Sequence, residues 1–192
     1  MFIQTESTPN PRTLKFLPGC DVLGRGSREF ADADAALASP LAHALFDVDG
    51  VERVYLGADF ITITKGEGVE WPHLKPHVLA AIMDHFTSGR PVLGDMDAPA
   101  DQTGEADIVY EGDAANIVKE LKEIIEARVR PAVARDGGDI TFHSWDHEQG
   151  VVRLNMRGAC AGCPSSTLTL KQGIENMLRH YVPEVNRVEQ VV

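Results

Sequence analysis

The sequence has few cysteines, few cationic side chains and no long apolar run. Its three cysteines are an odd number, which makes a poor disulfide framework and favours a metal or redox site in a reducing compartment. Lys and Arg number 18 against 29 Asp and Glu, for a formal net charge of -11. This acidity argues against nucleic acid and anionic membrane surfaces as partners. No apolar run approaches the roughly 18 residues of a membrane span.

The beginning of the sequence has no recognisable targeting pattern. Residues 1–6 show neither the basic and apolar regions of a secretory signal nor the Arg-rich composition of a transit sequence. We therefore expect a soluble protein of a bacterial cytoplasm. A mature mitochondrial form is the less favoured alternative.

An acidic segment divides the sequence into two halves. Seven carboxylates lie between residues 94 and 113, Lys and Arg are absent from 91 to 118, and Pro99 and Gly104 interrupt any helix. Such a composition favours an extended, solvated linker, although an acidic surface loop would have a similar one. We predict an α+β protein with two small domains, 1–93 and 114–192, joined by a flexible linker at 94–113.

The N-terminal half alternates strand and helix patterns and has no evident catalytic cluster. Ser39 before Pro40 is a favourable helix start. Two β-rich runs around Gly57-Ala58-Asp59 indicate a hairpin. The expected elements are a strand pair around Ile3 and Leu14–Phe16, a helix from Pro40 to about Phe46, strands at Val51–Leu56 and Phe60–Thr64, and a helix from Trp71 to Gly89.

The C-terminal half predicts the order helix, hairpin, helix, strand. Pro131 is expected to break or kink the first helix, and Asp136–Asp139 forms a turn that needs glycine. Residues 140–145 alternate as in a half-buried strand, with Ile140, Phe142 and Ser144 on one face. The expected elements are a helix through Ile117–Arg128, strands at 140–145 and Val151–Met156, a helix through Leu170–Tyr181, and a last strand within Val185–Val191.

The candidate site is the loop around Cys160 and Cys163. Two cysteines three positions apart can direct both sulfurs at one metal, and Gly158 and Gly162 let the backbone fold back without Cβ clashes. Pro164 suits the first turn of a helix, which places Cys163 next to a helix N-terminus. The dipole there favours thiolate, which is both a metal ligand and a nucleophile.

Several kinds of chemistry fit this pair. A thiol–disulfide couple is one, but its motif is expected after a strand in a βαβ unit, and the predicted order shows a hairpin instead. A zinc-stabilised interaction module could add His143 and His147, although both are more simply explained as surface histidines of the hairpin. Two ordinary loop cysteines are the least specific explanation.

An iron–sulfur cluster is the third chemistry. Such clusters usually take four thiolates, whereas one chain offers two in the motif. Cys20 follows Pro18-Gly19 in the other half and is expected to be an ordinary loop cysteine. Two copies of the chain supply four thiolates, so a cluster shared between two subunits is the simplest complete site.

Longer stretches of sequence around the two cysteines identify a protein family more specifically than the cysteine spacing alone. Arg130–Ile140 (RPAVARDGGDI) and Gly158–Lys171 (GACAGCPSSTLTLK) resemble the hairpin signature and cluster loop of the Nfu family of iron–sulfur scaffold and carrier proteins. Shorter stretches resemble that family's N-terminal module, which would precede a C-terminal NifU-like domain. They are Thr8–Pro11, Leu14–Phe16, Ser39–Leu41 and Asp59–Thr62.

The resemblance implies a non-enzymatic carrier. It implies a labile [4Fe–4S] cluster held by Cys160 and Cys163 of two subunits, received from an upstream donor and passed to apo-proteins of the aconitase or lipoyl synthase kind. The N-terminal module would serve client recognition or stability. A homodimer is then the expected cluster-bound state, and the runner-up function is a thiol–disulfide oxidoreductase.

Overall fold

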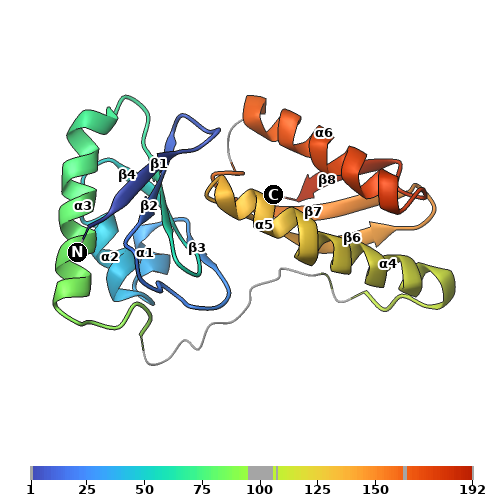
Figure 1. The fold of residues 1–192 in the computed structure, drawn as a ribbon, viewed down its shortest axis with the longest axis horizontal. Helices are drawn as coiled ribbons and strands as arrows, with labels where there is room; N and C mark the ends of the chain where they lie inside the picture. The colour runs from blue at the N-terminus through green and yellow to red at the C-terminus, as the bar shows by residue number, and fades with distance from the viewer. Residues whose placement is uncertain (1, 95–105, 107, 162–163, 192) are drawn as a thin grey trace. The chain divides into compact units, whose positions relative to one another are not determined.

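The chain forms two compact α+β units. The computed structural model describes residues 2–94, 106, 108–161 and 164–191, and only the backbone of 164–167. Contacts divide the chain into Met1–Asp101 and Gln102–Val192 (Figure 1). Each unit has its own cluster of buried hydrophobic side chains. The prediction of an α+β protein with two domains is confirmed.

Most of the predicted linker lies outside the described residues. Its described ends belong to the two units: the Gly94 amide donates to the Ala38 carbonyl over 2.9 Å, and the Ala106 amide donates to the His143 carbonyl over 3.0 Å. The second unit's first helix begins at Gly112, inside the segment expected to be linker. The predicted boundaries at 93 and 114, and the flexibility between them, stay predictions.

The first unit is an antiparallel five-stranded sheet in the order β1-β2-β5-β4-β3, packed against helices through a shared apolar cluster. Ser39 begins one helix as expected, because its hydroxyl accepts the Ala42 amide over 3.1 Å. The elements predicted for this half are present, and β3 and α1 are two that the sequence analysis did not predict. The elements are β1 (Gln4–Ser7), β2 (Thr13–Leu17), β3 (Arg28–Phe30), α1 (Ala33–Ala36), α2 (Pro40–Phe46), β4 (Val51–Leu56), β5 (Ile61–Lys65) and α3 (Trp71–Thr87).

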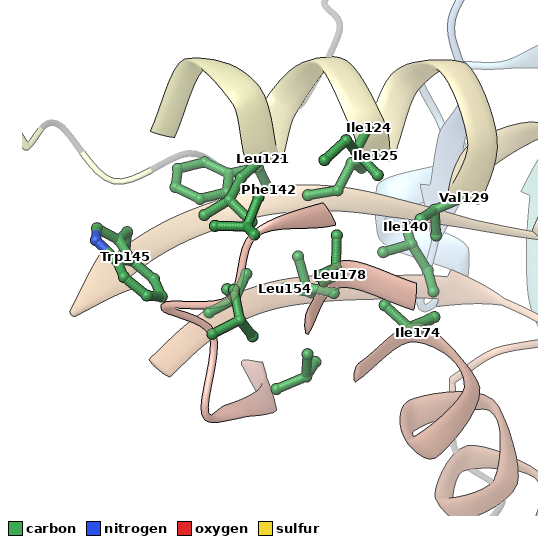
Figure 2. Close-up of a cluster of buried hydrophobic side chains, with 14 of the residues drawn as sticks. Leu121, Ile124, Ile125, Val129, Ile140, Phe142, Trp145, Leu154, Ile174 and Leu178 are labelled. Carbon is green, nitrogen blue, oxygen red and sulfur yellow. The ribbon is translucent and has the colours of Figure 1, made fainter. Parts of the chain in front are cut away.

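The second unit places helices on one face of a three-stranded sheet in the order β6-β7-β8. Ile140, Leu154 and Val188 carry that face, and Leu121 and Leu178 from two helices meet them in one buried cluster (Figure 2). The elements are α4 (Gly112–Ile124), the π-helical turn η1 (Ile125–Val129), α5 (Arg130–Arg135), β6 (Gly138–Asp146), β7 (Val151–Gly158), α6 (Pro164–Tyr181) and β8 (Arg187–Val191).

Pro131 does not end the first helix of this unit. The chain passes from α4 through the five-residue turn η1 into α5, where Pro131 lies in the first turn. The backbone is already helical at Val129 and Arg130, so Pro131 lies inside a continuous helix, where proline removes one backbone hydrogen bond and crowds the preceding turn. In place of the expected break, the helix widens locally into the π-helical turn η1 just before Pro131. Such π-turns are a known cause of irregularity in helices.

The alternation predicted for residues 140–145 is wrong at its end. The β6–β7 register shifts between Phe142 and Ser144, as at a β-bulge, where one strand carries an extra residue. The shift brings Trp145, at 4 % exposure, to the core face beside Phe142 (Figure 2). Ser144 was expected to share that face, and a bulge cannot be seen in a period-two pattern.

None of the helices in the described part of the chain combines the length and the apolar character that a bilayer span requires.

The separate cores predict that the second unit folds alone. The Tyr110 hydroxyl accepts the Trp145 amide over 2.8 Å, and Tyr110 and Ala114 pack on the second core. A fragment of residues 106–192 should therefore unfold cooperatively in urea. A fragment of residues 114–192 should be less stable by about 1–2 kcal/mol, because it lacks that acceptor and the first turn of α4. Equal stability of the two fragments, or an unfolded 106–192 fragment, would contradict this division.

Candidate functional site

Cys160 lies in a tight turn directly after β7. Gly158 ends the strand with a φ of +61°, a left-handed conformation that suits glycine. The Cys160 amide donates to the Arg157 carbonyl over 3.3 Å, and the Ala161 amide to the Gly158 carbonyl over 3.1 Å. Helix α6 begins at Pro164, as the sequence predicted. Cys163 lies outside the described residues, so its place next to the helix N-terminus stays a prediction.

The cysteine loop belongs to a βαβ unit, contrary to the sequence prediction. β8 runs parallel to β7, and α6 is the connection between them. The parallel partner follows the motif in the sequence, so a search for βαβ before the cysteines could not find it. The argument from chain order against a thiol–disulfide couple is therefore wrong. The surroundings and the pKa of the Cys160 thiol are the better criterion.

Cys160 is seated against the beginning of β6. A Cβ atom built on Gly138 would lie 2.4 Å from the Cys160 sulfur and 2.9 Å from the Arg157 carbonyl, so only glycine permits this approach. The neighbouring Gly137 has a φ of +79°, and its carbonyl accepts the Ala159 amide over 3.1 Å. The glycine turn predicted before β6 thus forms one wall of the cysteine loop.

We call this buried position of Cys160 against Gly137, Gly138 and the Arg157 carbonyl its seat. The seat keeps the Cys160 thiol protonated. Burial, and to a smaller extent the carboxylates of Asp136 and Asp139, raise its pKa to about 12. A thiol of this kind is a poor nucleophile at neutral pH, whereas a dithiol enzyme needs a thiolate. A metal centre removes the difficulty, because binding displaces the proton and supplies the positive charge that the thiolate requires. In the described state Cys160 is therefore a poor redox nucleophile.

An ion pair that the sequence analysis missed borders this seat. Arg130 donates to both carboxylate oxygens of Asp139, from Nε over 2.8 Å and from Nη2 over 2.9 Å. Its remaining nitrogen, Nη1, bonds both oxygens of Glu126 at 2.9 and 3.0 Å. These contacts raise the pKa of Arg130 above its ordinary value, with the Asp139 bonds as the largest cause. Both residues lie in the stretch quoted above, but no spacing rule pairs positions nine apart.

The other candidate ligands are Cys20, His143 and His147. Cys20 is exposed and belongs to the first unit. His143 is half-buried on β6, with Nδ1 3.1 Å from the Ser144 hydroxyl, and His147 is exposed with its ring near Trp145. Across the residues that the structure describes, no group of three or more His, Cys, Asp or Glu side chains could hold a metal.

Relatives match this chain along its whole length. NifU-like protein 5, mitochondrial, of Arabidopsis thaliana is 50% identical over 99% of this chain and 68% of its own length. NifU-like protein 4, mitochondrial, of the same plant is 51% identical over 99% of this chain and 66% of its own. The NFU1 iron-sulfur cluster scaffold homolog, mitochondrial, of Drosophila sechellia is 53% identical over 100% of this chain and 65% of its own.

These relatives contradict the prediction of a bacterial cytoplasmic protein, since all three are named mitochondrial. The chain spans about two thirds of their length. Its first residues were therefore a poor guide to the compartment.

Family models match both units separately. Residues 3–89 match the model described as scaffold protein Nfu/NifU N terminal. Residues 121–189 match the NifU-like domain, which contains both cysteines of the motif. This chain belongs to the Nfu/NifU family of iron–sulfur cluster scaffold proteins, with an Nfu N-terminal unit followed by a NifU-like domain.

Proposed function

We propose that this protein carries a [4Fe–4S] cluster between the Cys160 and Cys163 loops of two subunits and transfers it to apo-proteins. The cluster is cargo, so the protein acts as a carrier and not as an enzyme. The observation that supports this most is the seat of Cys160. Its sulfur lies in a buried turn against Gly138, at a distance that only glycine permits. Burial also raises the pKa of the thiol, so the sulfur becomes a thiolate when a metal takes the place of its proton.

The number of thiolates supports sharing between subunits. A [4Fe–4S] centre usually takes four cysteine thiolates, and each chain brings two in its motif. A cluster held by two chains loses half its ligands when they separate. Release to a client then proceeds by replacement of carrier thiolates with client thiolates, and the protonation of Cys160 in its buried seat favours the release.

The partners follow from this cycle. An upstream donor supplies the cluster, and clients are apo-proteins whose own thiolates complete a cluster site. The first unit has a separate core and no cysteine other than Cys20, so we assign it to client recognition or stability. The names of the relatives favour a mitochondrial setting for this exchange.

A thiol–disulfide couple is the second candidate, because the motif follows β7 within a βαβ unit. The high pKa of Cys160 argues against it. Absorbance separates the two: anaerobically loaded carrier should show a broad band at about 400 nm, whereas a dithiol enzyme should show none and should reduce a disulfide substrate.

Cluster binding should drive self-association. The expected content is about four iron and four sulfide per two chains, and a ligand that binds only the dimer shifts monomers into dimers. The net charge of -11 on each chain opposes association weakly at physiological salt, because screening reduces repulsion between separated charges.

Analytical ultracentrifugation of apo and loaded protein, with iron counted on each species, tests this proposal. Loaded protein should sediment as a dimer. A monomer that holds a complete cluster would contradict the shared site and would require ligands from Cys20, a histidine or a small thiol.

A further inference from the structure

The Arg130–Asp139 pair joins the helix α5 to the start of β6. Asp139 is 5 % exposed, and both of its oxygens face the guanidinium of Arg130. Oδ1 also accepts the Ile140 amide over 2.8 Å. Such a bidentate, partly buried pair has a fixed geometry. Buried ion pairs often add little net stability over apolar packing, so the role of this pair is better sought in the geometry that it fixes.

That geometry concerns the seat of Cys160. Asp139 directly follows Gly138, the residue that leaves no room for a Cβ beside the Cys160 sulfur. The backbone before it is tied to the cysteine loop by the bond from the Ala159 amide to the Gly137 carbonyl. A shift of Asp139 would therefore move the wall on which the thiol rests.

We propose that Arg130 and Asp139 are positioning residues of the cluster site, which together hold the Gly137–Gly138 backbone against Cys160. The importance of the seat for cargo rests on the proposed function, but the seat itself exists in the apo-protein. Arg130 acts through Asp139 and touches no ligand. Its fork of two donors, and not only its charge, is what the geometry requires.

A purely electrostatic role makes different predictions for two of the three variants, Asp139→Asn and Arg130→Lys. If Arg130 only offset the negative charge of the cargo, Arg130→Gln would weaken cluster binding and Asp139→Asn would strengthen it. Arg130→Lys, which keeps the charge, would then resemble the wild type. A positioning role requires all three variants to change in the same direction, because lysine lacks the planar fork and asparagine offers only one acceptor oxygen.

The first test needs no cluster. In a full-length background with Cys20→Ser and Cys163→Ser, Cys160 is the single thiol of the chain, and its rate of alkylation by iodoacetamide reports opening of the seat. Arg130→Lys, which keeps both charges, should raise that rate about tenfold through local opening. Asp139→Asn also removes a carboxylate that raises the pKa of Cys160, so its rate is compared at equal thiolate fraction, taken from the pH profile of alkylation, and should be raised by a similar factor. Arg153→Gln is the control. It removes an ion pair to Asp146 and Glu189 in the same sheet, and it should leave the rate unchanged.

The second test uses the full chain loaded with cluster. The decay of the band at about 400 nm in excess chelator should be several-fold faster in Arg130→Lys, Arg130→Gln and Asp139→Asn than in the wild type and Arg153→Gln. Circular dichroism identifies folded variants. Arg130→Gln carries the greater risk of unfolding because it leaves a buried carboxylate without its main partner, and the other two variants keep the test open.

The outcomes separate the two proposals. Unchanged alkylation in Arg130→Lys and Asp139→Asn, or slower cluster decay in Asp139→Asn, would overturn the positioning role. Equal effects of Arg153→Gln would also overturn it, since they would indicate general loosening of the unit. A wild-type protein that takes up no cluster would refute the proposed function, while the alkylation result would still decide whether the pair seats Cys160.

Discussion

Replacing Cys160 or Cys163 with serine is expected to abolish stable cluster binding. Each chain brings two motif thiolates, so a single change removes two of the four that a shared cluster uses. Serine is a poor ligand here because its hydroxyl does not deprotonate near neutral pH as a metal-bound thiol does. After anaerobic reconstitution, bound iron and sulfide should fall to less than about a tenth of the wild-type content.

Cys20→Ser is the matched control for this prediction. Cys20 is exposed in the first unit, and it should be dispensable. Its variant should keep the iron content, the absorbance band and the dimeric sedimentation of loaded wild-type protein. Loss of iron from Cys20→Ser alone, with both motif variants still loaded, would show that the ligand assignment is wrong.

The local elements of the fold were readable from the sequence where short-range rules decide them. Ser39 before Pro40 begins α2 through a side-chain cap, and turn residues at 57–59 separate β4 from β5. The cysteine motif was visible for a similar reason. Its spacing and its glycines are local, so no knowledge of the tertiary structure was needed to find it.

Tertiary features were the ones that the sequence could not predict. The bulge that buries Trp145 depends on the pairing of β6 with β7, and the π-turn before Pro131 depends on how one helix fits the core. Arg130 and Asp139 meet only because α5 folds back on β6. The high pKa of Cys160 likewise arises from burial and from carboxylates that are far away in the sequence but near in the fold. The spacing of the cysteines does not reveal either cause.

Gly138→Ala is the second change with a large expected effect. The new Cβ would lie 2.4 Å from the Cys160 sulfur, 2.9 Å from the Arg157 carbonyl and 3.1 Å from the Cys160 amide nitrogen. Two of these neighbours are backbone atoms of the β7 end and its turn, so a rotamer change cannot relieve the contact. The β6–β7 ladder must open at Gly138 and Gly158, which pair directly, or the cysteine loop must move away.

Either response damages the site more than the rest of the unit. We expect Gly138→Ala to lower the free energy of unfolding by about 1–3 kcal/mol, as overpacking does. It should also shorten the lifetime of the bound cluster in excess chelator about tenfold or more. Urea unfolding of the apo-protein and decay of the absorbance band measure these two effects separately.

Gly173→Ala provides the contrast within the same unit. Gly173 lies on α6 with nothing within 4 Å of an added Cβ, so alanine removes backbone freedom without a clash. It should raise the free energy of unfolding by about 0.5–1 kcal/mol and leave the cluster lifetime unchanged. If Gly138→Ala held its cluster as long as Gly173→Ala does, the close approach of β6 to Cys160 would have no part in holding the cargo. A shorter lifetime in Gly138→Ala alone would identify the glycine wall as part of the cluster site.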